Sequence, residues 1–205
     1  MDIISIIAAT MGVAWASGIN LYAAVFMLGW MFSTGSIDLP PDLQILGNPL
    51  VLAAAGFMYA VEFFADKIPG VDTGWDVLHS FIRIPAGAML AAGAISPLGA
   101  EAELAGLLLG GTLTAGSHMT KAGSRVLINT SPEPFSNWAA SIGEDVAVIG
   151  GLWTALHYPI GFIVALVVFI ALMIWLLPKI WRGIKTVFRK IGSLFGRKPD
   201  VEESG

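Results

Sequence analysis

The sequence predicts an all-α membrane protein, a polytopic transmembrane helix bundle of about six spans with a C-terminal amphipathic interfacial helix. Of the 205 residues, 56% are hydrophobic and only 13% are charged, and the mean hydropathy is +0.76. Soluble domains carry about 25% charged residues. A helix needs about 20 apolar residues to cross a bilayer core of about 30 Å, so this length accommodates about six spans with short connections.

Six apolar stretches follow one another, each bounded by polar, proline or glycine residues. We expect helices at residues 3–32, 49–66, 77–95, 104–128, 135–156 and 160–177. The first stretch has neither a basic leader nor a small-residue cleavage site, so we expect a retained span and not a signal peptide. The third contains Pro85, which opposes the carbonyl four residues before it, so we expect this helix to break there.

The basic residues predict the orientation, because Lys and Arg resist transfer across the membrane. On a six-helix arrangement they all lie at or beyond one face, whereas the connections near Asp38, Glu101 and Tyr158 contain none. That face is expected to be cytoplasmic. Six crossings then place both termini in the cytoplasm.

The expected parts of the chain are a transmembrane domain at 1–178, a basic amphipathic helix at 179–198 and a disordered tail at 199–205. After Pro178, apolar residues at 180, 184, 187, 191 and 194 oppose Arg182, Lys185 and Arg189. This pattern predicts a helix on the inner leaflet, where anionic lipids contribute about 1 kcal/mol for each basic residue.

Small residues recur at every fourth position in two of the stretches. If the first three helices repeat as the last three, the odd number of spans makes the halves inverted, as in many transporters. The alternative is two ordinary faces for close helix packing. The two ridges are Ala8, Gly12, Ala16 and Asn20, and Gly106, Gly110, Thr114 and His118.

Ionisable residues inside the spans are the main functional signal, because a charge at the bilayer centre costs about 2.5–3.5 kcal/mol. We expect acids to pair with bases across the bundle, for example Glu62 or Glu144 with Lys121 or Arg125. Such pairs serve either structure or a solute path, and the alternative for the asparagines is helix capping. The candidate path residues are Asn20, Glu62, Asp66, His118, Lys121, Arg125, Asn129, Asn137, Glu144 and Asp145, with Ser131 nearby.

Asp72, Asp76, His79 and Arg83 are spaced by four, three and four residues, so a helix would align them on one face. Carboxylates with a histidine are weak candidates for a divalent metal or an acid-base pair. The favoured interpretation is an interfacial helix with its charged face in water. Cysteine is absent, which excludes disulfides and thiolate metal sites, and the sequence indicates no particular cofactor.

Several motifs occur in one order along the chain: the runs 18–23, 62–69 and 118–134, then Glu144-Asp145. Asp72, Trp75-Asp76 and His79 lie between the second and third. Over residues 8–159 the sequence resembles the bacterial membrane-protein family of domain of unknown function 4126. The resemblance implies a bacterial inner-membrane protein and carries over no activity, cofactor or residue role.

The leading hypothesis is a small transporter or channel for an ion or small polar solute. One alternative is a membrane-embedded enzyme that uses Asp72, Asp76 and His79 on a lipid or phosphate substrate at the cytoplasmic interface. Another is a non-catalytic scaffold whose partner faces surround Gly12 and Gly110. The expected partners are the lipid bilayer, with anionic lipids at the C-terminal helix, and a second copy in a homodimer, but no nucleic acid.

Overall fold

The structure, a computed structural model, describes residues 2–68, 70–130 and 135–195, with side chains described as far as Arg189. Ser131, the side chains of the last turns of the amphipathic segment and the tail at 199–205 lie outside the described residues. The described part contains helices and no strands, which confirms the all-α prediction. The elements are α1 (Ile3–Ser33), η1 (Pro41–Gly47), α2 (Pro49–Ala65), α3 (Val71–Ile95), η2 (Ser96–Leu98), α4 (Ala100–Ile128), α5 (Phe135–His157) and α6 (Pro159–Phe195).

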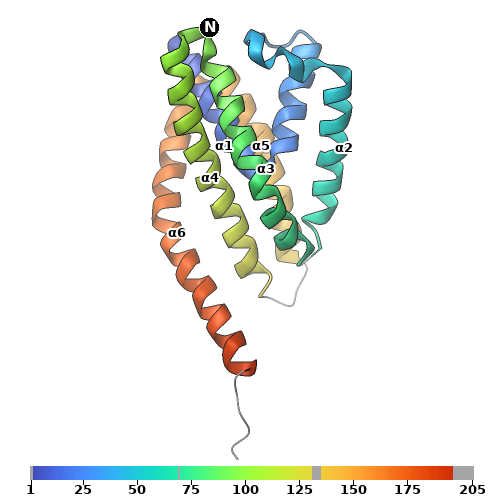
Figure 1. Ribbon diagram of the computed structural model, residues 1–205, viewed down its shortest axis with the longest axis vertical. Helices are drawn as coiled ribbons and strands as arrows, with labels where there is room; N and C mark the ends of the chain where they lie inside the picture. The colour runs from blue at the N-terminus through green and yellow to red at the C-terminus, as the bar shows by residue number, and fades with distance from the viewer. Residues whose placement is uncertain (1, 69, 131–134, 196–205) are drawn as a thin grey trace, which may run out of the picture.

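Several helices are suited to a membrane. Within the described residues, four segments are long and apolar enough to cross one: Ile3–Ser33, Val71–Leu98, Phe135–His157 and Pro159–Arg189. The pair formed by η1 and α2, bent by 68°, is a fifth candidate. Glycine, threonine, serine and histidine lower the hydropathy of α4, which lies beside these helices in the bundle (Figure 1). The chain therefore contains several helices that could span a membrane.

Helix α1 contains a break at Asn20. The backbone of this residue is extended, with φ −146° and ψ 95°, inside an otherwise helical segment. Its side-chain Oδ1 accepts a hydrogen bond of 2.9 Å from the backbone N–H of Ala23. A side chain that accepts from the N–H three residues later is a helix N-cap. Asn20 thus ends a first arm, residues 3–19, and begins a second arm, residues 21–33.

The two arms fold back on each other. Ile6 of the first arm and Leu28 of the second line the same cavity, although a straight helix would hold them about 33 Å apart. Figure 1 shows α1 leaving the end of the bundle marked N and returning to that end, where η1 follows. Helix α1 is therefore a helical hairpin, whose tip, residues 18–20, lies inside the bundle.

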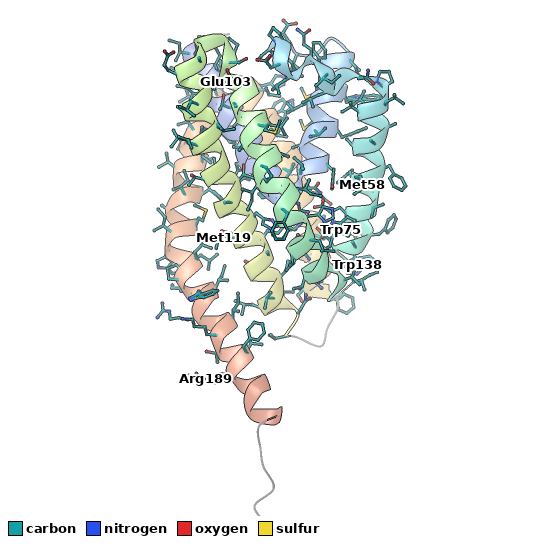
Figure 2. All side chains as sticks on the ribbon, in the orientation of Figure 1. Met58, Trp75, Glu103, Met119, Trp138 and Arg189 are labelled. Carbon is teal, nitrogen blue, oxygen red and sulfur yellow. The ribbon has the colours of Figure 1, made fainter. Side chains whose placement is uncertain are left out.

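This hairpin corrects the expected topology. Helices α2 to α6 alternate in direction, and the ends of α1 and α6 that carry the two termini lie at opposite ends of the bundle (Figure 1). Glu103 lies at the N-terminal end, whereas Trp75 and Trp138 lie toward the other end and Arg189 beyond it (Figure 2). Six crossings with both termini on one face do not fit this fold. Hydropathy failed here because it measures apolar content and not direction.

Two prolines were expected to end helices, and both lie inside one. Helix α3 continues through Pro85 and α6 through Pro178. A proline removes one backbone N–H and bends a helix, but in a membrane bundle neighbouring helices stabilise the bent segment. The broken third span is therefore wrong, and residues 179–195 extend α6. Ile180 is buried and faces Gly123 of α4. The first apolar residue of this extension therefore packs against another helix of the protein.

Small residues bring α1 and α4 together. A Cβ atom on Gly18 would meet the Ser117 hydroxyl and the Thr114 carbonyl oxygen. The Thr114 hydroxyl donates to the carbonyl of Ala14 (2.8 Å), and the Ser117 hydroxyl donates to the carbonyl of Trp15 (3.1 Å). The two predicted small-residue ridges do not form this interface as such, because Gly12 faces α5 and α6 and Gly106 faces α3, whereas Thr114 contacts α1. An inverted relation between the halves stays a prediction.

Substituting Gly18 by Ala should loosen this interface. The added methyl group overlaps α4, and such overpacking lowers stability by about 1–3 kcal/mol. Gly143→Ala is the matched control, because a Cβ there meets nothing within 4 Å and alanine favours a helix by about 1 kcal/mol. Thermal unfolding in detergent, followed by tryptophan fluorescence, should place Gly18→Ala below and Gly143→Ala at or above the unchanged protein. Equal unfolding temperatures would contradict the close packing.

The hairpin also predicts which positions share a membrane face. Cysteine is absent, so single cysteines at Asp2, Asp38, Glu101 and Arg189, which are all exposed, report one site each. A membrane-impermeant maleimide should label the first three from one face and Arg189→Cys from the other. Labelling of Asp2→Cys and Arg189→Cys from the same face would instead support a first helix that crosses the membrane.

Candidate functional site

A cluster of ionisable side chains lies beneath the tip of α1, between α2, α3, α4 and α5. We call these seven residues the charge network. Six of the seven side chains have 5% exposure or less, and Glu144 has 20%. The network consists of the bases Arg83, Lys121 and Arg125 and the acids Glu62, Asp66, Asp76 and Glu144.

Lys121 lies at the centre of the network. Its ammonium nitrogen is 2.8 Å from Asp66 and 3.2 Å from Glu62. Asp76 and Glu144 lie at 3.8 and 3.6 Å from the same nitrogen. One cation thus holds carboxylates from α2, α3 and α5, which explains how it remains charged away from water.

Arg83 forms the α3 side of the network. Its guanidinium pairs with Glu62 and lies 2.9 Å from Asp76. The same guanidinium lies 3.5 Å from Nδ1 of His118, whose Nε2 is 2.6 Å from the hydroxyl of Ser80. His118 therefore bridges the arginine and a neutral hydroxyl.

Arg125 forms the α5 side. Its Nη2 and Nε atoms donate to the two carboxylate oxygens of Glu144 at 2.7 and 3.2 Å, a bidentate pair. Its Nη1 donates to the backbone carbonyls of Asp66 (3.2 Å) and Asn137 (3.0 Å). The expected pairs of Glu144 with Arg125 and Glu62 with Lys121 are both present.

The tip of α1 contacts the network directly. The Lys121 ammonium donates to the carbonyl of Ile19 at 3.1 Å, at the C-terminal end of the first arm. A cation there is favourable because the helix dipole places partial negative charge at that end. The amide of Asn20 donates to the carboxylate of Asp145 at 3.1 Å. Both arms of α1 are therefore anchored at the break by charged groups.

A second polar group joins the ends of α3, α4 and α5. The amide of Asn129 donates to both carboxylate oxygens of Asp72 (2.8 and 3.0 Å) and to the hydroxyl of Thr73 (2.9 Å). The amide of Asn137 donates to Asn129 Oδ1 at 2.7 Å. Asn129 and Asn137 thus connect the ends of these helices by hydrogen bonds. Asn137 also accepts a hydrogen bond from Arg125, which links this group to the charge network.

The residues considered for a metal have separate partners. Asp72 binds Asn129, Asp76 pairs with Arg83, and Nδ1 of His79 lies 2.9 Å from the carbonyl of Trp75. Among the described residues, no group of three or more histidine and carboxylate side chains is arranged to hold a metal ion. The favoured interfacial helix is also wrong, because Asp72, Asp76 and Arg83 are fully buried.

Carboxylates exceed bases within the network. In the described part of the chain, four buried carboxylate oxygens have no hydrogen-bond partner: Glu62 Oε2, Asp66 Oδ1, Asp76 Oδ2 and Asp145 Oδ2. Four acids face three bases in the network, and Asp145 adds a further acid through Asn20. Each of these acids has a partner on its other oxygen, and the Nε of Arg83 likewise has no hydrogen-bond partner. The excess of carboxylates gives the site the capacity to take up a proton or a small cation.

A cavity of about 180 Å³ reaches the network from the α6 side. Ile19 of the tip, Lys121 and Glu144 line it together with the hydroxyls of Ser117, Thr120 and Ser124. Hydroxyl and carboxylate oxygens suit a hydrated or partly hydrated cation. The cavity therefore connects the partly exposed Glu144 with the tip.

Most residues of this site were predicted from the sequence, but the environment of the α3 residues was predicted wrongly. Asn20, Glu62, Asp66, His118, Lys121, Arg125, Glu144 and Asp145 all converge. Arg83 and Asp76 were assigned to a water-facing surface, and Ser80 was not considered. The signal that could have identified them is their spacing of three and four residues, which puts Asp76 and Arg83 on one face of α3. His118, Lys121 and Arg125 have the same spacing on α4, and these two faces contact each other.

One family model, described as "Domain of unknown function (DUF4126)", matches residues 7–179. No curated protein and no solved structure matches the chain. The matched residues include the tip, the charge network and the second polar group.

Removing the central cation should destabilise the fold. Lys121→Met leaves Asp66 without a close partner, because its next cation is the Arg125 guanidinium at 3.8 Å, and breaking a buried pair lowers stability by about 3–5 kcal/mol. Adding Asp66→Asn removes that unpaired charge and should restore part of the loss. Lys185→Met is the control, because Lys185 is exposed. The measurement is thermal unfolding in detergent. Equal unfolding temperatures for Lys121→Met and Lys185→Met would contradict the central role of Lys121.

Proposed function

We propose a function from the site geometry, because the chain belongs to the DUF4126 family, whose description assigns no activity. The protein is a small membrane transporter or channel for an ion or small polar solute. The observation that carries this proposal is the contact between the broken helix α1 and the buried charge network.

Broken helices within a membrane have a particular use. Non-helical backbone is tolerated there only where it is buried in protein or lines a cavity. In transporters, the ends of half-helices point at the solute and its coupling ion near the bilayer midplane. Here the first arm directs its C-terminal carbonyl at Lys121, and Ile19 of the tip also lines the cavity of about 180 Å³. This arrangement supports a solute site at the tip.

The charge balance favours a cation over an anion. The network and Asp145 together contain more carboxylates than bases, and several carboxylate oxygens lack a hydrogen-bond partner. The cavity itself is lined by one acid, Glu144, and one base, Lys121. The preference for a proton or small monovalent cation therefore rests on the excess of carboxylates in the network as a whole. We propose proton or small-cation transport.

The two sides of the tip differ. Toward the N-terminal end of the bundle, the space between the arms is a mostly apolar cavity of about 260 Å³ whose lining includes Val13 and Leu28. The other side leads through Glu144 to the polar cavity. Transport then requires the arms of α1 to move relative to α4 and α5, so that the site faces each membrane side in turn.

The proposed location is the bacterial inner membrane. The basic residues that follow α2 and extend α6 lie toward the end of the bundle opposite the N-terminus, and this end is cytoplasmic by the distribution of Lys and Arg. The proposal therefore places the C-terminus in the cytoplasm and the N-terminus on the other side. Anionic lipids at the basic part of α6 and a homodimer stay predictions.

Substituting Asn20 by Ala tests the proposal. The change removes both the cap on Ala23 and the bond to Asp145, so proton or cation flux should fall at least several-fold. Asn48→Ala is the matched control, because Asn48 caps the N-terminus of α2 through Leu50 and lies far from the network. The measurement is gradient-driven flux of protons, Na⁺ and K⁺ into proteoliposomes, followed with trapped indicator dyes.

Two results would count against transport. One is the absence of flux for all three ions and for a screen of small polar solutes with the folded protein. The other is equal flux in Asn20→Ala and Asn48→Ala, which would make the tip a structural feature alone.

A further inference from the structure

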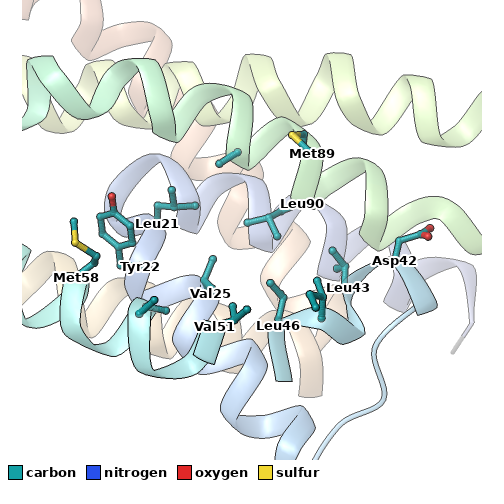
Figure 3. A pocket seen from close by; sticks show the side chains of 14 residues that line it. Leu21, Tyr22, Val25, Asp42, Leu43, Leu46, Val51, Met58, Met89 and Leu90 are labelled. Carbon is teal, nitrogen blue, oxygen red and sulfur yellow. The ribbon is translucent and has the colours of Figure 1, made fainter. Parts of the chain in front are cut away.

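A further cavity contains none of the charged side chains of the network in its lining. It is a groove of about 490 Å³ between the second arm of α1, η1, α2 and α3. Figure 3 shows Val25 and Val51 facing it from opposite walls, with Leu43 and Leu46 toward one end and Tyr22 and Met58 toward the other. We call it the α2 groove.

The walls of the α2 groove are almost entirely apolar. Fourteen residues line it, and only Asp42 and Tyr22 carry a polar side chain. Asp42 belongs to η1 at one end, and Tyr22 lies at the other end next to the tip of α1 (Figure 3). A polar solute would therefore find no hydrogen-bond partners along most of the groove, whereas hydrocarbon would be compatible with all of it.

The groove opens toward the bilayer. Large apolar side chains next to it are exposed on η1, α2 and α3: Ile45 at 60%, Leu50 at 80%, Phe57 at 67% and Met89 at 68%. In a membrane protein, such exposed side chains face lipid chains and not water. The surroundings of the opening are thus hydrocarbon.

The dimensions suit a lipid chain better than a partner helix. Since an α-helix with side chains is about 10–12 Å wide, a volume of about 490 Å³ would hold about one turn of it. Along α2, the groove runs from Val51 to Met58, a rise of about 10 Å. One leaflet of the hydrocarbon core is about 15 Å deep, so the groove covers most of the depth of a single leaflet.

We propose that the α2 groove binds one acyl chain of a bilayer phospholipid from the leaflet on the N-terminal side, with its headgroup at η1. The headgroup then lies beside Asp42, at the end of the bundle that also carries Asp38, Glu101 and Glu103. These carboxylates favour a zwitterionic headgroup with an amine over an anionic one. This lipid would bind whether or not the protein transports a solute.

A bound chain would contact the moving part of the proposed transporter. Leu21, Tyr22 and Val25 of the groove belong to the second arm of α1. The ring of Tyr22 packs edge-on against His79, with centroids 5.8 Å apart. The lipid chain therefore contacts the second arm and fills the space between that arm and α2.

A photo-crosslinking experiment tests this site. The full-length protein is reconstituted in nanodiscs that contain a phosphatidylethanolamine with a diazirine in its acyl chain, and crosslinked residues are identified by mass spectrometry. Met58 and Met89, which line the groove, should be among the strongest sites. Replacing this lipid with a phosphatidylglycerol that carries the same diazirine chain should lower the labelling several-fold.

A filled groove provides the decisive comparison. Ala54→Trp places a large ring in the groove, whereas Ala53→Trp places the same ring on an exposed position of α2 outside it. Labelling at Met89 should fall several-fold in Ala54→Trp and stay unchanged in Ala53→Trp, with both variants unfolding at similar temperatures. If Ala54→Trp does not fold, Ala86→Phe on the α3 wall replaces it.

Three outcomes would overturn the proposal. Equal labelling over all exposed apolar positions would mean that the groove is ordinary bilayer surface. Labelling that persists in the filled variants would place the lipid elsewhere. Crosslinks from groove residues to a second protein chain would show that protein, not lipid, covers the opening.

Discussion

The structure depends on a single buried ammonium group. Lys121 contacts two carboxylates of α2, one of α3 and one of α5, and donates to the last carbonyl of the first arm of α1. No other residue of the charge network contacts all of these elements. Because breaking a buried pair leaves uncompensated charge in a medium that cannot solvate it, the positions of five helices are coupled through this one group.

This constraint explains why the first helix turns where it does. The small residues of α1 and α4 allow the two backbones to approach, and hydroxyls of α4 satisfy carbonyls of the first arm. The arm ends where the Lys121 ammonium donates to its terminal carbonyl, that of Ile19. Asn20 then begins the second arm and reaches Asp145. Packing against α4 therefore determines the direction of the first arm, and the position of the Lys121 ammonium determines where the arm ends.

The sequence predicted the helical class, most helix boundaries and the pairing of Glu62 and Glu144 with bases of α4. These follow from local properties: apolar runs, proline and glycine ends, and three- or four-residue spacing. It did not predict the return of α1, because residues 3–33 are apolar throughout and the break rests on one asparagine. Nor did it predict the burial of Asp72, Asp76 and Arg83, because their partners lie on helices distant in sequence, such as Asn129 and Glu62.

The hairpin also determines the order in which the protein is able to assemble. Its tip is stabilised by a lysine that the ribosome adds about a hundred residues after Asn20, an interval of roughly 5–20 s at ordinary rates of synthesis. During that time the carbonyl of Ile19 and the amide of Asn20 lack the partners that they later acquire. The tip of α1 is therefore able to form its final contacts only after α4 and α5 have been made.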